Sequence, residues 1–132
     1  MAMLVTGVDI IEIERIKNVF ERYGDKFLNR IYTVGERRYC RGRAPQLASR
    51  FAAKEAVMKL LGTGIRGVHW SHIEVVRGRG QAPTILLHGT ALARAKRIGV
   101  EYVALSLSHS RDFAVATVVG ESEYGNLIPR GA

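Results

Sequence analysis

The sequence has a single cysteine, Cys40, and no long apolar segment. One cysteine excludes an intrachain disulfide and a metal centre built from several thiolates. No apolar run approaches the ~18 residues that a membrane-spanning helix requires. The first residues, MAMLV, also lack the basic stretch and apolar core of a signal peptide. We therefore expect a cytoplasmic protein that does not enter a membrane.

Acidic residues are scarce relative to basic ones, with 12 Asp and Glu against 20 Lys and Arg, so the formal net charge is +8. A chain of this charge attracts nucleic acids, phosphorylated small molecules, acidic proteins or anionic membranes. A basic nucleic-acid-binding domain without catalysis is one candidate function. The basic residues, however, are spread along the chain, and no recognition helix or aromatic-rich pair of strands accompanies them.

The hydrophobic pattern predicts one α+β domain. Short links between the later strands favour a mainly antiparallel sheet, packed against a long N-terminal helix and a second central helix. We expect this domain to cover residues 1–120 and residues 121–132 to form a polar tail that frays or was added to the chain. The expected strands are 4–10, 73–77, 84–88, 102–108 and 113–119, and the expected helices are 11–31, with a break near Gly24, 45–61 and 89–98.

Asp9 has two interpretations, because it lies at the junction of the first expected strand and the first expected helix. The run Asp9-Ile10-Ile11-Glu12 fits a capping box, in which the aspartate accepts a hydrogen bond from a helix N–H group. Alternatively, the carboxylate has a functional role. The residues around Asp9 leave both interpretations open.

Glu55 and Lys59 also have two interpretations. They are four residues apart on the central helix, which is typical of a surface ion pair. Ala52, Ala53 and Ala56 make one flank of this helix thin enough for a ligand or another backbone to approach. A structural module without chemistry would use Asp9 only as a cap and Glu55 with Lys59 only as a surface pair.

Taken together, the motifs resemble those of the holo-(acyl-carrier-protein) synthases, the short single-module 4′-phosphopantetheinyl transferases. The resemblance is collinear from Leu4 to Val119, and it departs at Ser49, where a glycine is common, and in the basic stretch 36–40. The matching segments are GVDI (7–10), RFAAKEA (50–56) with Lys59, GTG (62–64), AP (82–83), LHG (87–89), SLSHS (106–110) and FAVA (113–116).

The resemblance implies transfer of the 4′-phosphopantetheine group of coenzyme A to a serine of an apo acyl carrier protein, with release of 3′,5′-ADP, as in fatty acid biosynthesis. Asp9 and Glu55 would hold Mg²⁺ beside the pyrophosphate, which suits a cation that takes one or two carboxylates plus phosphates and waters. Lys59 would stabilise the transition state as a point charge. Either Glu55 or a metal-bound water would take the serine proton.

The resemblance also implies binding surfaces. The acidic carrier protein would dock on the first helix, and the enzyme would be a homotrimer with its sites at subunit interfaces and with no nucleic-acid or membrane partner. The residues expected to bind coenzyme A are Arg50, Lys54, Gly62, Thr63, Gly64, Ser108 and His109. Those expected to bind the carrier protein are Arg15, Arg22 and Lys26, with Phe27 as an apolar anchor.

Overall fold

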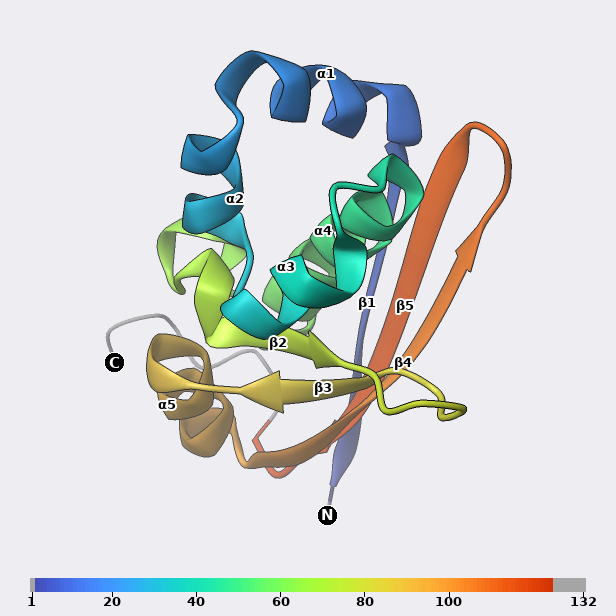
Figure 1. The fold of residues 1–132 in the computed structure, drawn as a ribbon. Coiled ribbons are helices and arrows are strands. Elements are labelled where there is room, and N and C mark those ends of the chain that lie inside the picture. Colours follow the sequence, from blue (N-terminus) through green and yellow to red (C-terminus); the bar gives the residue numbers. More distant parts are fainter. Residues whose placement is uncertain (1, 125–132) are drawn as a thin grey trace.

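The computed structural model describes residues 2–124 as an α+β fold (Figure 1). The strands are β1 (Met3–Glu12), β2 (Ile73–Val76), β3 (Thr84–Leu87), β4 (Val100–His109) and β5 (Phe113–Ser122). The helices are α1 (Ile13–Tyr23), α2 (Asp25–Ile31), α3 (Val34–Cys40), α4 (Ala44–Leu61) and α5 (Gly89–Ile98), with short 3₁₀ turns η1 (Gly64–Arg66) and η2 (Trp70–His72).

All strand pairs in the described residues are antiparallel, as the sequence predicted. β1, β5 and β4 form one sheet in that order, and β2 and β3 form a separate pair. Along β1, Val5, Gly7 and Ile11 are buried, while the residues between them are exposed or only partly buried. This alternation gives the larger sheet an inner face that packs on α4 and an outer face that no described residue covers.

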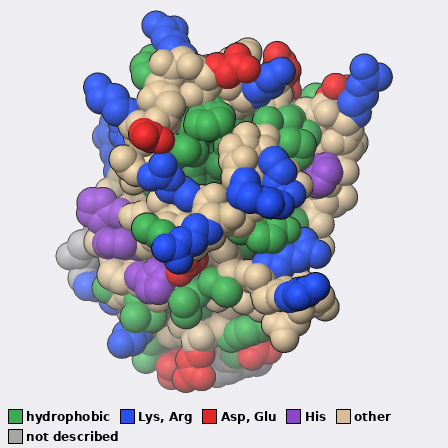
Figure 2. All heavy atoms as spheres, viewed as in Figure 1, with side chains coloured by type: hydrophobic (Ala, Val, Ile, Leu, Met, Phe, Trp, Pro, Cys, Tyr) green, Lys and Arg blue, Asp and Glu red, His purple; other side chains and the backbone are tan. Residues whose placement is uncertain are grey.

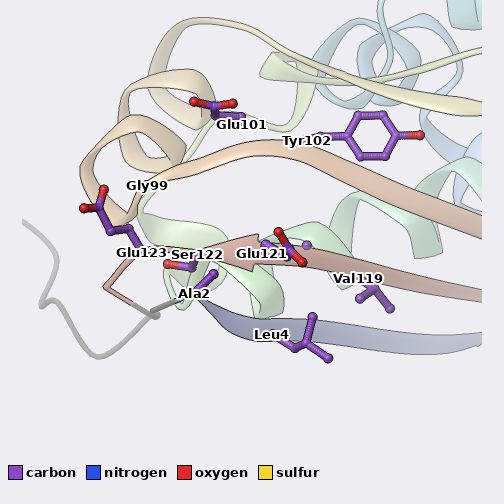
Figure 3. Close-up of a pocket in the computed structure, with 10 residues that line it drawn as sticks. Ala2, Leu4, Gly99, Glu101, Tyr102, Val119, Glu121, Ser122 and Glu123 are labelled. Carbon is purple, nitrogen blue, oxygen red and sulfur yellow. The ribbon is translucent and has the colours of Figure 1, made fainter.

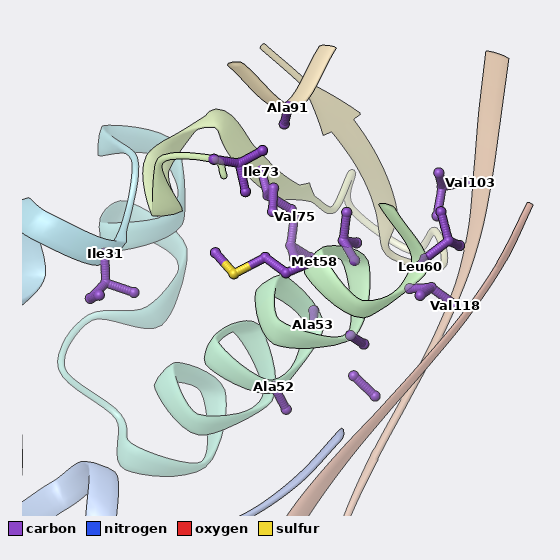
Figure 4. Packing of buried hydrophobic residues seen from close by; sticks show 14 of the residues in the cluster. Ile31, Ala52, Ala53, Met58, Leu60, Ile73, Val75, Ala91, Val103 and Val118 are labelled. Atoms are coloured by element: carbon purple, nitrogen blue, oxygen red, sulfur yellow. The ribbon is translucent and has the colours of Figure 1, made fainter. Parts of the chain in front are cut away.

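The predicted central helix, residues 45–61, is confirmed as α4, which begins one residue earlier. Pro45 lies in its first turn, where a missing N–H group costs nothing, and Gly62 ends it in the left-handed conformation at φ 73°. The helix is buried on nearly every side, as Figures 1 and 4 show, with the larger sheet against one flank and β2 against another. It therefore forms the core of the domain.

Small residues let β1 lie unusually close to α4. A Cβ atom built on Gly7 would lie 1.9 Å from the carbonyl oxygen of Ala56. No side chain fits in that space, so the contact requires glycine at position 7. The fully buried Ala52, Ala53 and Ala56 keep the facing side of the helix equally thin.

The beginning of the chain differs from the prediction. β1 continues to Glu12, and α1 starts only at Ile13, because residues 10–12 still pair with β5. Asp9 thus lies inside a strand, and the capping interpretation is wrong; the N-cap residue is Glu12, which makes no side-chain cap bond. The expected break near Gly24 is present, with Gly24 at φ 54° between α1 and α2.

The prediction missed helix α3. It begins with a complete capping box, in which Thr33 accepts from the Glu36 N–H group and Glu36 accepts from the Thr33 N–H group. The expected tail also begins too early, because Glu121 and Ser122 pair with Leu4 and Met3 within the sheet. The rest of that tail, from residue 125 onward, lies outside the described residues. None of the helices between residues 2 and 124 is long and apolar enough to cross a bilayer.

The contact at Gly7 predicts a large effect of one methyl group. In Gly7→Ala, the new Cβ forces β1 away from α4, and we expect a loss of about 1–3 kcal/mol in the free energy of unfolding. Thr6→Ala, an exposed change on the same strand, is the control and should cost far less. Urea unfolding measures both variants, and equal stabilities for Gly7→Ala and the wild type would contradict the close contact.

Candidate functional site

Asp9, Glu55 and Lys59 meet where β1 passes over α4. Lys59 Nζ lies 3.2 Å from Asp9 Oδ1 and donates a hydrogen bond of 2.9 Å to the Val8 carbonyl. The Asp9 side chain is only 12% exposed, whereas that of Lys59 is 56% exposed. Lys59 therefore pairs with the strand residue and leaves much of its charge open to a ligand.

Glu55 lies beside Asp9 in this cluster. Partial burial is the main reason that its pKa is raised, and the adjacent Asp9, which is also in hydrogen-bond contact, raises it further. Lys59 and Arg15 act in the opposite direction but do not cancel the effect. Two carboxylates held together in this way repel each other when both are ionised.

A shallow hollow of about 230 Å³ opens beside the two carboxylates. Asp9, Glu55, Arg15 and Phe113 line it together with neighbouring residues of β1. Arg15 was expected only on the docking face, and Phe113 was expected to have no role. Only the fold brings the start of α1 and the start of β5 to this place, so sequence spacing alone could not reveal them.

The pair of carboxylates fits a Mg²⁺ ion that is shared with a phosphorylated ligand. Residues 2–124 contain no cluster of three or more His, Cys, Asp or Glu residues that could enclose a metal alone. Mg²⁺ commonly uses one or two carboxylates and completes its octahedron with phosphate oxygens and waters. A divalent cation between Asp9 and Glu55 would also relieve their mutual repulsion.

Lys54 has a structural role, and the expectation that it contacts coenzyme A needs correction. Its side chain is 0% exposed and forms an ion pair of 2.7 Å with Glu36, which is also 0% exposed. Its Nζ donates further hydrogen bonds to the carbonyls of Trp70 and Ile73. Burial lowers the pKa of Lys54, and Glu36 opposes that shift. A ligand cannot reach Lys54 without opening the core.

Glu36 is a structural neighbour of the site that the sequence did not reveal. Its carboxylate also accepts hydrogen bonds from the N–H groups of Thr33 and Val75. The pair with Lys54 therefore ties α3 and β2 to α4. The capping signature of Thr33 and Glu36, three residues apart, was the available signal.

The other residues expected to bind coenzyme A do not lie together within one chain. Arg50 is 4% exposed, with its guanidinium 4.2 Å from the centre of the Tyr39 ring. Ser108 and His109 are exposed at the end of β4, and neither lines the hollow of Asp9 and Glu55. The segment 62–64 directly follows α4, with Gly62 and Gly64 at positive φ.

The expected docking residues lie on α1 and α2. Arg15, Arg22 and Lys26 are exposed, but Phe27 is only partly so, because it packs edge-on against Tyr32 at a ring distance of 5.7 Å. Phe27 is therefore a weaker apolar anchor than expected. Figure 2 shows lysine and arginine side chains scattered over the visible face and not gathered into one stripe.

A larger hollow of about 490 Å³ lies at the opposite end of the sheet from α1 (Figure 3). Three of its lining residues are acidic: Glu101, Glu121 and Glu123. Among residues 2–124, no lysine, arginine or histidine lines it. Such a surface repels phosphates, so the smaller hollow at Asp9 and Glu55 is the better candidate for phosphate chemistry.

Comparison with known proteins shows the family of this chain. Residues 6–118 match the family model described as the 4′-phosphopantetheinyl transferase superfamily. A holo-[acyl-carrier-protein] synthase of Koribacter versatilis is 48% identical over 90% of this chain and 98% of its own length. A protein of the same name from Gloeobacter violaceus is 52% identical, covering 85% of this chain and 88% of its own.

Solved structures give the same result. The Helicobacter pylori holo-[acyl-carrier-protein] synthase in complex with coenzyme A aligns with a TM-score of 0.79 and 31% identity, over 87% of this chain and 98% of its own. A Bacillus anthracis synthase in complex with coenzyme A (3′,5′-ADP) aligns with a TM-score of 0.74 and 37% identity, over 93% and 100%. With nearly the whole chain matched in sequence and in fold, the protein belongs to the 4′-phosphopantetheinyl transferase superfamily.

Proposed function

We propose that this protein is a holo-(acyl-carrier-protein) synthase that transfers the 4′-phosphopantetheine group of coenzyme A to a serine of an apo acyl carrier protein. The convergence of Asp9, Glu55 and Lys59 beside one hollow is the observation that carries the proposal. The curated relatives bear the same name. We also propose that the enzyme acts in fatty acid biosynthesis, in the cytoplasm.

The residues of the site have complementary roles in this reaction. Asp9 and Glu55 would hold Mg²⁺, which neutralises charge on the pyrophosphate and improves 3′,5′-ADP as a leaving group. Lys59, anchored on Asp9 and the Val8 carbonyl, directs its charge toward the phosphates and stabilises the transition state. Glu55, whose pKa is raised by burial and by the neighbouring Asp9, would accept the serine proton.

We further propose that the enzyme is a homotrimer with sites between subunits. The outer face of the larger sheet leaves Leu4 71%, Val8 56% and Ile10 61% exposed on β1, and Tyr102 67% exposed on β4. An apolar sheet face of this kind is typical of a buried interface between chains. Such an assembly would let Ser108 and His109 of one chain complete the coenzyme A site of its neighbour, since they lie outside the hollow of their own chain.

The direct test is mass spectrometry of an apo acyl carrier protein after incubation with this protein, coenzyme A and Mg²⁺. The proposal requires the carrier protein to gain one phosphopantetheine group, and requires EDTA to prevent the gain. An unmodified carrier protein, with both substrates shown to be intact, would refute the proposed activity.

Replacing the helix carboxylate should separate activity from stability. We expect Glu55→Gln to lower kcat by roughly a hundredfold or more, because one ligand of the cation and the proton acceptor are lost together. The melting temperature without Mg²⁺ should stay the same or rise. A raised carboxyl pKa means that the folded state binds the proton more tightly than the unfolded state, so ionisation of Glu55 costs stability as pH rises through that pKa.

Melting curves of the wild type and Glu55→Gln across pH measure this effect. The difference in melting temperature should be small in acid, where Glu55 is neutral, and should grow in favour of the variant as pH rises above the ordinary glutamate range. Mg²⁺ should stabilise the wild type more than the variant. A clear destabilisation of Glu55→Gln, with near-normal turnover, would show that Glu55 is a structural residue.

A charge on the outer sheet face should dissociate the trimer. We expect Val8→Glu to convert a particle of three times the 14.6 kDa chain mass into monomers, because the carboxylate would be buried unpaired at the interface. Leu86→Glu, at a comparably exposed aliphatic residue of β3, is the control and should stay trimeric. Light scattering after size exclusion reports the mass; a wild-type monomer, or a trimeric Val8→Glu, would contradict the proposed interface.

Reversal of charge on α1 should weaken carrier-protein binding selectively. Arg22 is exposed and lies beyond the hollow of Asp9 and Glu55, so Arg22→Glu should raise the KM for the carrier protein and reduce its salt dependence, with coenzyme A affinity unchanged. Arg79→Glu, in the link between β2 and β3, is the matched control. Equal effects of the two variants would mean that net charge, and not the α1 surface, governs docking.

A further inference from the structure

Histidine side chains gather where η2 packs against α5. His69 directly precedes η2, His72 is its last residue, and His88 is the N-cap residue of α5. The rings of His69 and His72 lie edge to face, with 4.9 Å between their centroids. Figure 2 shows histidine side chains together at the left of the visible face, the side on which Figure 1 places α5. None of these residues lines the hollow of Asp9 and Glu55.

The imidazole of His72 caps the first turn of α5. His88 makes no side-chain cap bond, and the N–H group of Thr90 donates instead to His72 Nδ1 at 3.0 Å. A backbone N–H group can only donate, so Nδ1 presents its lone pair and the ring proton of neutral His72 lies on Nε2. The Thr90 hydroxyl accepts a hydrogen bond from the His69 N–H group and donates to the same Nδ1 at 2.9 Å. Both donors of Thr90 therefore require a neutral His72.

Gly89 leaves the space that this contact needs. A Cβ atom built on Gly89 would lie 2.5 Å from Cε1 of His72, and the φ of 46° at this position is itself unfavourable for other residues. The ring of His72 therefore lies directly against the backbone at the start of α5. A side chain at position 89 would push the ring away and break the hydrogen bond to Thr90.

The surroundings of His72 oppose a positive charge on its ring. Partial burial is the main reason that the pKa of His72 is lowered, and the charges of the nearby His69 and His88 lower it further. Glu74 of β2 provides a carboxylate on this side, but it lies 2.9 Å from Nε2 of His88 and pairs with that histidine. His72 therefore stays neutral to a lower pH than an ordinary histidine does.

Fixed charges on the other elements around this contact are mainly basic. Three arginines of η1 and α5 line the hollow that Thr90 also lines: Arg66, Arg94 and Arg97. The helix α2, which packs against η2, carries one acidic and two basic residues, all exposed: Asp25, Lys26 and Arg30. No ion pair between residues 2 and 124 involves His72. A proton on His72 would therefore gain no direct negative partner in this part of the chain.

We propose that His72 and Thr90 form an acid-sensitive latch that holds the start of α5 against η2. A proton that binds Nδ1 occupies the lone pair to which Thr90 donates, so the two groups then present hydrogen to hydrogen. The imidazolium also faces the positive end of the helix dipole. Because Arg94 of α5 donates a hydrogen bond of 2.9 Å to the Leu61 carbonyl, an open latch also loosens the packing of α5 on the end of α4. The latch does not depend on the proposed transferase activity.

The lowered pKa of His72 sets the pH range of the latch. In the unfolded chain His72 takes up a proton near its ordinary pKa of about 6.5, whereas in the folded protein it does so only at lower pH. The stability that the latch contributes is therefore fully present above about pH 6.5, and it is lost as pH falls through the pKa of the folded state.

NMR of the histidine rings, combined with amide hydrogen exchange in α5, tests the latch. In the wild type we expect the proton of neutral His72 on Nε2, and a roughly threefold or greater loss of protection in α5 between about pH 7.5 and about pH 5. His72→Asn keeps an acceptor near the position of Nδ1 but carries no charge, so it should abolish this loss. His109→Asn, at an exposed histidine at the end of β4, is the matched control and should show the wild-type loss.

Three results would overturn the proposal. The first is a neutral His72 with its proton on Nδ1, and the second is a His72 pKa at or above the ordinary value. The third is an acid loss of α5 protection in His72→Asn as large as in the wild type. The first two come from the wild type alone, so they test the latch even if the variant fails to fold.

Discussion

The close approach of β1 to α4 at Gly7 is the contact on which the site depends. Asp9 is two residues further along the same face of the strand, and Glu55 immediately precedes Ala56, whose carbonyl faces Gly7. The two carboxylates therefore lie at the same place because two backbones touch there. A larger residue at position 7 would separate strand and helix by roughly the width of a methyl group, and a shared cation tolerates little change in ligand distance.

A second anchor holds the opposite flank of the same helix. Lys54 and Glu36 are both fully buried and paired. Lys54 donates hydrogen bonds to carbonyls of η2 and β2, and Glu36 accepts hydrogen bonds from N–H groups of β2 and of the N-cap of α3. A buried ion pair adds little net stability relative to apolar residues, but removal of one partner is costly. The pair therefore specifies how α3 and β2 pack against α4. Because Glu55 is adjacent to Lys54 in the helix, the same contacts hold the backbone of Glu55 in place.

The sequence predicted the features that depend on local backbone preference, and it missed those that depend on contacts between distant residues. Pro45 and Gly62 marked the ends of α4 because each acts through its own backbone preference. The capping interpretation of Asp9 was wrong because Asp9 and Glu12 fit a capping box as well as a strand, and pairing with β5 decided between them. The family resemblance suggested Lys54 as a phosphate or structural contact, and only the structure decides for the structural role, because the burial of Lys54 depends on Glu36, eighteen residues away.

The adjacent carboxylates of Asp9 and Glu55 lower the stability of the fold that holds them. Small residues let the two acids lie together between strand and helix, and partial burial, followed by the neighbouring Asp9, raises the pKa of Glu55. Lys59 relieves part of their repulsion through Asp9 but remains largely exposed. A cation bound together with substrate phosphates would neutralise the two carboxylates. The free energy of that interaction would therefore be gained only when the cation and the substrate are both bound. The repulsion between Asp9 and Glu55 that lowers the stability of the free protein would therefore favour binding of the cation and the substrate.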